Sequence, residues 1–456
     1  MKLSRRDFLR ATSLLAGGLG LAGLPGVFQR RLLAQGIPSN KKLLFIFQTG
    51  GNDGLNTVIP RGDADYNVDN RPSLYIPESL GIDSGNGFAQ FHPRLQPMME
   101  IYNNSGLNGQ DGPGNLAVLH RIGYAGQSRS HFDSQQFWQN GVPGDPRLEE
   151  GMFYRYLEES QALGADDGSL VAAAISSSQI LALKGDAPVP NFSRASQFNV
   201  IGSRTRAGKF LGYGPSQAGG SDGEGLLGLY GLSPDSVSRP YRSLVHRTGD
   251  ALGATINTLQ EAVQQGVYTP ENGAVYPNGS LGTKLQEAAL LFKRTPVRIV
   301  GMNVGGWDTH TGQGQVNGNH GDLLETLAQG FQAIYRDLQS QWDDLLIVTM
   351  TEFGRTSIEN GSGGTDHAES GVMFVAGGGV KGGVYNCDAS TWAPGDMFSA
   401  NERYLARRTD FRAVFGEIFQ RYFGDVPSSL DRIIPGYDLA AAENPANFAQ
   451  LGFLEG

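Results

Sequence analysis

The chain of 456 residues contains a single cysteine, Cys387, so no disulfide can form within it. Charge is also sparse: charged residues are 18% of the chain, and the formal net charge is -9. An acidic surface repels nucleic acid and anionic membranes, so neither is expected as a partner. After the N-terminal leader, no run approaches the ~20 apolar residues that span a bilayer. We therefore expect no stable transmembrane segment in the mature chain.

Familiar nucleotide-binding and hydrolase motifs are missing as well. The glycine-rich segment 377–383 lacks the spacing of a phosphate-binding Walker loop, and no convincing G-x-G-x-x-G follows an expected strand. There is no G-x-S-x-G elbow either. A Ser-His-Asp hydrolase thus has no local signature.

The N-terminus is typical of an export signal. Segment 4–10 reads Ser-Arg-Arg-Asp-Phe-Leu-Arg, a weakly apolar stretch follows, and a small-residue site lies near Ala34. This order describes a signal peptide, and the paired arginines indicate the twin-arginine type. We predict a signal over 1–34, the twin-arginine translocase as the partner during export, and a periplasmic or extracellular protein. The alternative is a membrane anchor, which the glycines and Pro25 within the stretch disfavour.

The remaining chain, 40–456, is predicted to form one α/β domain with a mainly parallel central sheet between two helical layers. Amphipathic helical stretches separate short apolar runs that are typical of buried strands. The expected strands are 43–47, 116–120, 170–174, 297–304, 345–350 and 372–376, and the expected helices are 251–263, 285–292, 323–338 and 411–423. Segment 188–238, rich in Gly and Ser, is predicted as a surface excursion, either a lid or a decorative loop.

Polar residues follow several of these strands. In open α/β sheets, ligands bind at the carboxyl ends of the strands, so we expect these residues to share one edge. The segments are 48–56 after the first strand, 128–132 after the second, 305–310 after the fourth, and 352–355 with 364–367 after the fifth. Together they bring Asp, His, Glu, Ser and Arg to that edge.

Asp and His in these segments suggest a metal site. Residues two apart on an extended segment point to the same side, so Asp308 and His310 can grip one cation. Asp366 and His367 are adjacent, and His131 lies in the second segment. Carboxylate with imidazole suits a divalent metal such as Zn²⁺ or Mn²⁺. The alternative for any one pair is a hydrogen-bonded loop anchor.

Other residues of these segments are ambiguous. Asp53 follows two glycines and is a candidate ligand or a turn residue. Ser128 and Ser130 precede a helical run, where a serine acts as a nucleophile or as a plain N-cap. Arg129 and Arg355 are candidates to clamp an oxyanion, or to pair with a carboxylate.

Five of these motifs, occurring in order, resemble the bacterial family known as domain of unknown function 1501, which is related to the alkaline phosphatase and sulfatase superfamily. The motifs are those at 50–56, 128–132, 306–310, 352–355 and 364–367, in addition to the leader. The resemblance implies an alkaline-phosphatase-like fold. It also implies that Asp53, Asp308, His310 and His367, with Asp366 beside it, bind metal. His131 is a further candidate ligand because of its place in the second segment. Where the superfamily has an adjacent Asp-His pair, this chain has Glu352 and Arg355. A one-metal or altered site is therefore an alternative to a two-metal site.

The expected function is metal-dependent hydrolysis of phosphate or sulfate esters on a small molecule or glycan. Ser130 or a metal-activated water would attack, Arg355 or Arg129 would stabilise the ester oxygens, and Glu352 would assist. The alternative is a non-catalytic exported binding or envelope protein on the same fold, because a fold does not dictate its function.

Overall fold

The computed structural model describes residues 40–103, 114–160, 170–187, 189–198, 252, 254–424 and 430–455. Residues 41–456 form one compact unit. The predicted leader and most of the predicted excursion lie outside the described residues. None of the helices in the described part of the chain combines the length and the apolar content that crossing a bilayer requires.

A nine-stranded sheet lies at the centre, in the order β11-β5-β10-β9-β1-β8-β6-β7, with β12 also paired to β5. The central strands match the predicted ones. Their bounds are β1 Lys42–Gln48, β5 Leu116–Gly123, β6 Ala172–Ile175, β8 Ile299–Val304, β9 Leu345–Thr351 and β10 Gly371–Gly377. The shorter edge strands are β7 Asn191–Phe192, β11 Gly383–Tyr385 and β12 Thr409–Asp410. Strand β7 lies within the segment predicted as an excursion, so the described part of that segment adds an edge to the sheet.

Only β10 runs against the others among these strands. It pairs antiparallel with both β9 and β5, whereas every other pairing in this sheet is parallel. The residues that precede β10 therefore lie at the edge where the parallel strands end. The predicted mainly parallel α/β sheet is confirmed.

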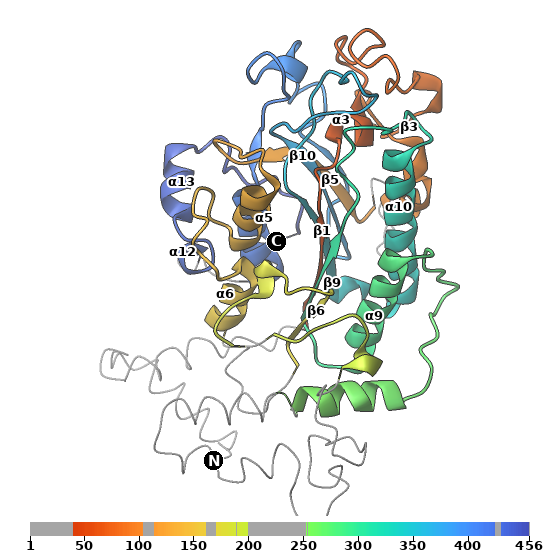
Figure 1. Cartoon of the computed structure of the whole chain (residues 1–456), viewed down its shortest axis with the longest axis vertical. Helices are drawn as coiled ribbons and strands as arrows, with labels where there is room; N and C mark the ends of the chain where they lie inside the picture. Colours follow the sequence, from red (N-terminus) through yellow and green to blue (C-terminus); the bar gives the residue numbers. More distant parts are fainter. Residues whose placement is uncertain are drawn as a thin grey trace, which may run out of the picture. The chain divides into compact units, whose positions relative to one another are not determined.

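Helices cover both faces of the sheet (Figure 1). One face carries α9 (Ser280–Arg294) and α10 (Asn319–Asp337), and the other carries α5 (His131–Asn140), α6 (Met152–Glu159) and α12 (Leu430–Ile433). Helices α11 (Phe411–Glu417) and α13 (Tyr437–Glu443) belong to the second layer. The predicted three-layer arrangement is thus present.

Alternating residues of β1 explain why both faces need cover. Leu44 and Ile46 enter one buried cluster, with residues of α9 and α10, while Phe45 and Phe47 enter the other, with residues of α5, α6 and α11. Burying one such side chain stabilises the fold by about 1.5–3 kcal/mol. A strand that is apolar from Leu43 to Phe47 is thereby held in the middle layer.

Outside this sheet, the loop after β1 begins a smaller structure. Helix α3 (Gly54–Thr57) leads into a three-stranded sheet in the order β2-β4-β3, formed by β2 Val58–Pro60, β3 Ile82–Asp83 and β4 Ala89–Phe91. This structure holds the residues around Asp53 in place.

Candidate metal centre

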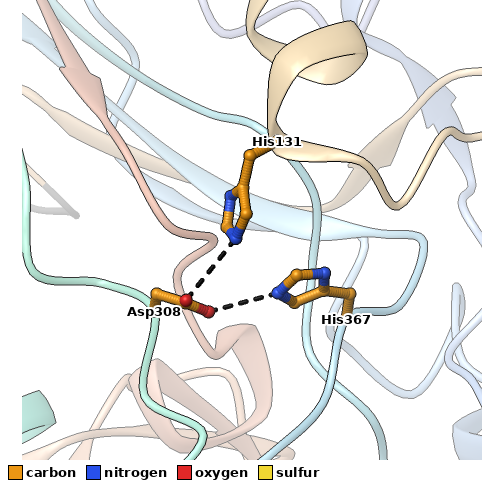
Figure 2. A group of neighbouring side chains, drawn as sticks. All are labelled: His131, Asp308 and His367. Carbon is orange, nitrogen blue, oxygen red and sulfur yellow. Dashed lines mark hydrogen bonds and ion pairs between the residues drawn. The ribbon is translucent and has the colours of Figure 1, made fainter.

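Three histidines and one aspartate meet at the carboxyl edge of the sheet, each carried by a segment that the sheet topology places there. Asp308 and His310 lie in the loop after β8, His131 is the first residue of α5, and His367 lies just before β10. Figure 2 shows His131 and His367 pointing at the Asp308 carboxylate from separate segments. One nitrogen of each of these two rings and one carboxylate oxygen all lie within 4.8 Å of one another.

His310 contacts both Asp308 and His367. Its Nε2 lies 3.1 Å from Asp308 Oδ1 and 2.9 Å from His367 Nε2. His367 Nε2 is also 3.1 Å from Asp308 Oδ1, and His131 Nε2 is 3.5 Å from Asp308 Oδ2. All three imidazoles therefore present Nε2 to the same carboxylate.

The second nitrogen of each ring has its own hydrogen-bond acceptor. His131 Nδ1 is 2.5 Å from Glu352 Oε2, His310 Nδ1 is 2.9 Å from Asp366 Oδ1, and His367 Nδ1 is 2.8 Å from the carbonyl oxygen of Arg129. A carbonyl or an ionised carboxylate only accepts, so Nδ1 carries the proton in each ring. The neutral ring then leaves Nε2 unprotonated, which is the form that binds a metal.

Asp308 is held in its charged form. Partial burial by itself raises the pKa of this carboxyl, but the hydrogen bond from Arg355 and the positive charge of its guanidinium oppose that rise, and the pKa is lowered to about 2. Arg355 Nη2 donates to Asp308 Oδ1 over 2.7 Å. Burial lowers the pKa of His367, which favours the neutral ring.

Local backbone patterns explain why the loop after β8 presents these two side chains. Trp307 and Thr309 are buried, whereas Asp308 is exposed and His310 is half-buried. This alternation is what an extended segment produces, and it agrees with the spacing argument from the sequence. The loop also packs tightly on its neighbour: at Gly50, with φ of 122°, a Cβ would collide with the backbone of Asp308.

The donor atoms fit a transition-metal ion. Unprotonated Nε2 atoms of His310 and His367 at 2.9 Å repel each other unless a cation or a shared proton lies between them. Bonds of about 2.0–2.1 Å to zinc place neighbouring ligand atoms roughly 3.3 Å apart in a tetrahedral site. The contacts of the three rings with Asp308 and the contact between His310 and His367, from 2.9 to 3.5 Å, agree with that spacing.

Asp53, predicted as a ligand from its place after β1, is used differently. Its carboxylate is fully buried and accepts from Arg71 Nη1 at 2.7 Å and from Gln313 Nε2 at 2.6 Å. Burial raises the pKa of Asp53, but the adjacent Arg71 guanidinium holds it below the ordinary value. Asp53 also caps α3, since its Oδ1 accepts from the N–H of Leu55. The positive charge beside Asp53 is thus a side chain of the protein.

Arg355, predicted to clamp a substrate oxyanion, has its donors occupied within the protein. Besides Asp308, it donates to the carbonyl oxygens of Gly50, Gly51, Trp307 and Thr365. Its side chain is buried, and it ties the loops after β1 and β8 to its own loop between β9 and β10. Pairing with a carboxylate, the stated alternative to an oxyanion clamp, is the arrangement that these contacts describe.

Glu352 and Asp366 accept hydrogen bonds from the Nδ1 atoms of two of the histidines, His131 and His310. Glu352 is fully buried and accepts from the N–H of Gly50 at 2.6 Å as well as from His131. Burial raises its pKa, and the hydrogen bond from His131 opposes that change. Asp366 accepts from Asn360 and His310, and these bonds lower its pKa. Both carboxylates orient rings, and neither belongs to the group formed by His131, Asp308 and His367.

The two serines before α5 differ in their hydrogen bonds. Ser128 Oγ accepts from the N–H of Ser130 and donates to Asp133, so its hydroxyl serves the helix start. Ser130 is the N-cap of α5, but its side chain makes no capping hydrogen bond. Arg129 is exposed, with its guanidinium 5.3 Å from the centre of the Tyr404 ring.

Three contributors were not predicted from the sequence. Arg71 neutralises Asp53, Gln313 links Asp53 to Thr309 and Thr365, and Phe353 packs its ring against His131 and His367. Phe353 lies within a motif already singled out and could have been found there. Arg71 and Gln313 carry no local signal, because their roles depend on partners far along the chain.

No curated protein matches the chain. The solved structures that match include alkaline phosphatase from the Antarctic bacterium TAB5, at 9% identity over 76% of this chain and 96% of that one, with a TM-score of 0.28. A mutant of that enzyme with Mg bound in its M3 site matches at 10% identity over 76% of this chain and 95% of that one, with a TM-score of 0.27. These scores are low, and the fold assignment rests on the sheet topology itself.

The family model described as "Protein of unknown function (DUF1501)" matches residues 283–399. This range contains Asp308, His310, Glu352, Arg355 and His367. The family model therefore matches the segment that supplies most of the candidate metal centre.

Proposed function

We propose that this chain is an exported, metal-dependent hydrolase of phosphate or sulfate esters. The observation that carries the proposal is the arrangement of His131, His310 and His367. Each ring has its Nδ1 bound to a separate acceptor and turns its Nε2 toward Asp308. Such outer acceptors orient metal-ligating histidines and raise their basicity.

The donor set favours Zn²⁺ or Mn²⁺, because imidazole nitrogen with one carboxylate suits these ions better than oxygen-only ions such as Ca²⁺. His131, Asp308 and His367 would hold the metal, and His310 lies beside them as a further nitrogen donor. A bound metal of this kind supplies Lewis acidity toward the ester oxygens. Asp53, being paired with Arg71, would not contribute, which favours the one-metal alternative.

The chain's own residues would do the remaining work. Ser130 is the proposed nucleophile, with water as the alternative, because its hydroxyl is not used for capping and it precedes His131. Arg129 is the cation left to contact ester oxygens, since Arg355 is enclosed. Arg355 and Glu352 would position Asp308 and His131.

A non-catalytic exported binding or envelope protein is the second candidate. The observation that favours it is the enclosure of Asp53 and Arg355, two of the residues expected to take part in ester chemistry. In that case the metal would stabilise the edge of the sheet without turnover.

The test is elemental analysis of the protein purified after export, together with assays on generic phosphate and sulfate esters. We expect one equivalent of transition metal and ester turnover that a chelator removes. Asp308→Ala and His310→Ala should lose the metal, whereas Asp69→Ala, an exposed carboxylate elsewhere, should keep it. Metal retained in both site variants would refute this centre. Metal without turnover would favour the binding protein.

Export is proposed to follow the twin-arginine route to the periplasm or beyond. Replacing Arg5 and Arg6 by lysine should leave the precursor in the cytoplasm, which immunoblots of cell fractions would show. Unchanged export of that variant would contradict the proposed route.

A further inference from the structure

A second polar cavity lies at the same edge of the sheet as the metal centre. Its volume is ≈ 360 Å³, and residues lining it include Ser177, Ser193, Arg194, Thr283 and Lys284. Cavities that hold small ligands start at roughly 300 Å³. No carboxylate lines this cavity, although the chain as a whole carries a net charge of -9.

The sheet topology places this cavity beside the metal centre. Ser177 follows β6, Ser193 and Arg194 follow β7, and Lys284 donates to the carbonyl of Asn303 near the end of β8. The metal centre is formed by the loop after β8, the start of α5 and the segment before β10. Strand β8 and the loop after it thus contribute to both sites, through Asn303 and then through Asp308.

The separation of the two sites is bounded by the chain that joins them. Asn303, whose carbonyl oxygen accepts from Lys284, and Asp308 of the metal centre are five residues apart. Five residues span at most about 17 Å when fully extended. One extended ligand can therefore reach both.

The two cations of the cavity make no hydrogen bond or ion pair with a carboxylate in the described part of the chain. Lys284 Nζ has a backbone carbonyl as its hydrogen-bond partner, and partial burial lowers its pKa. Arg194 is exposed, and its guanidinium makes no hydrogen bond or ion pair with any described residue. Glu287 lies outside the lining and accepts from the N–H of Ala195; burial raises the pKa of its carboxyl, and the positive charge of Arg194 opposes that rise.

We infer that this cavity binds a second tetrahedral oxyanion, a phosphate or sulfate group, of the same substrate whose ester is cleaved at the metal centre. Guanidinium, ammonium and hydroxyl donors without a competing carboxylate are the groups that recognise such an anion. The inference rests on the proposed function for the role of the anion as part of a substrate. It narrows the substrate class to compounds with two or more such groups, for example a multiply sulfated or phosphorylated glycan.

The direct test is calorimetric titration of the full chain with sodium sulfate at low ionic strength. The variant Arg194→Gln with Lys284→Gln should bind sulfate about tenfold more weakly, since each exposed ion pair contributes a fewfold effect. The control is Arg147→Gln with Lys381→Gln, which changes the net charge equally at exposed positions outside the cavity and should bind like the unaltered chain. Arg194→Lys should restore most of the affinity lost in Arg194→Gln.

Asp308→Ala separates this inference from the proposed function, because sulfate should still bind to the cavity when the metal centre is disabled. Sulfate binding that disappears in Asp308→Ala but survives in the cavity variant would overturn the inference. Equal losses in the control variant, or no binding by the unaltered chain, would overturn it too. If esters are hydrolysed, the cavity variant should raise the KM of a bis-sulfate or bis-phosphate substrate about tenfold relative to that of the mono-ester.

Discussion

Asp53 and Asp308 occupy equivalent places in the sequence pattern but have opposite environments. Each follows a parallel strand and a pair of glycines at the same edge of the sheet. Asp53 is fully buried against Arg71, whereas the Asp308 side chain is 46% exposed among three imidazoles. The charge of Asp53 is neutralised by Arg71, whereas the arrangement around Asp308 suits a bound cation.

The difference shows that a carboxylate at a strand end does not define a ligand by itself. The deciding feature is the counter-charge that the rest of the chain brings to it. Arg71 reaches Asp53 from the structure built around β2, β3 and β4, while Arg355 contacts only one oxygen of Asp308. Buried charge must be paired, but a partly exposed carboxylate can keep an oxygen for a metal.

The largest expected effect comes from breaking the buried pair. Arg71→Met should lower the free energy of unfolding by about 3–5 kcal/mol, because Asp53 would be left as an uncompensated buried charge. Urea unfolding measures this, and the double variant with Asp53→Asn should recover part of the loss. A loss in Arg71→Met below about 1 kcal/mol would show that the pair does not stabilise the fold as described.

A smaller effect is expected from loosening one ring of the metal centre. Glu352→Gln keeps the side-chain shape but removes the charge that orients His131, so metal affinity should fall about 10–100-fold. Competition with a coloured chelator measures the affinity. Asp366→Asn, which changes the acceptor of His310, is the matched comparison. Unchanged affinity in Glu352→Gln would remove His131 from the ligand set.

The smallest effect per side chain and per pH unit concerns three histidines that lie outside the metal centre. Burial lowers the pKa of His320 to about 3 and those of His92 and His120 to about 4. Their folded pKa values lie below the unfolded value of about 6.5, so the unfolded chain binds more protons between them. Stability is therefore full above about pH 6.5 and declines as the pH falls toward 4, by about 1.4 kcal/mol per pH unit for each histidine.

Urea unfolding at pH 7 and pH 5 measures this slope. His320→Gln should reduce it by one histidine's share, because the glutamine does not titrate. A slope unaffected by this substitution would indicate that His320 is not held neutral in the folded chain.

The order of strands and helices could be predicted because it depends on local patterns. Continuous apolar runs such as 345–350 predicted buried strands, and the repeat along 323–338 predicted the amphipathic helix α10. The convergence of Asp308 and His310 was likewise predictable, because side chains two apart on an extended segment share a side. The hydrogen bonds by which Glu352, Asp366 and Arg355 orient the ligands could not be predicted, because partners far apart in the chain leave no periodic signal.

The amino-acid sequence by itself determined the α/β architecture, the edge of the sheet at which polar residues gather, and the residue types available there. Only the tertiary structure decided how they are used. Strand β10 runs against its neighbours, and this direction brings His367 to the edge where β8 delivers Asp308. Packing around α3 brings Arg71 into hydrogen-bond contact with Asp53. Both outcomes depend on contacts between distant segments, whose energies no local sequence pattern encodes.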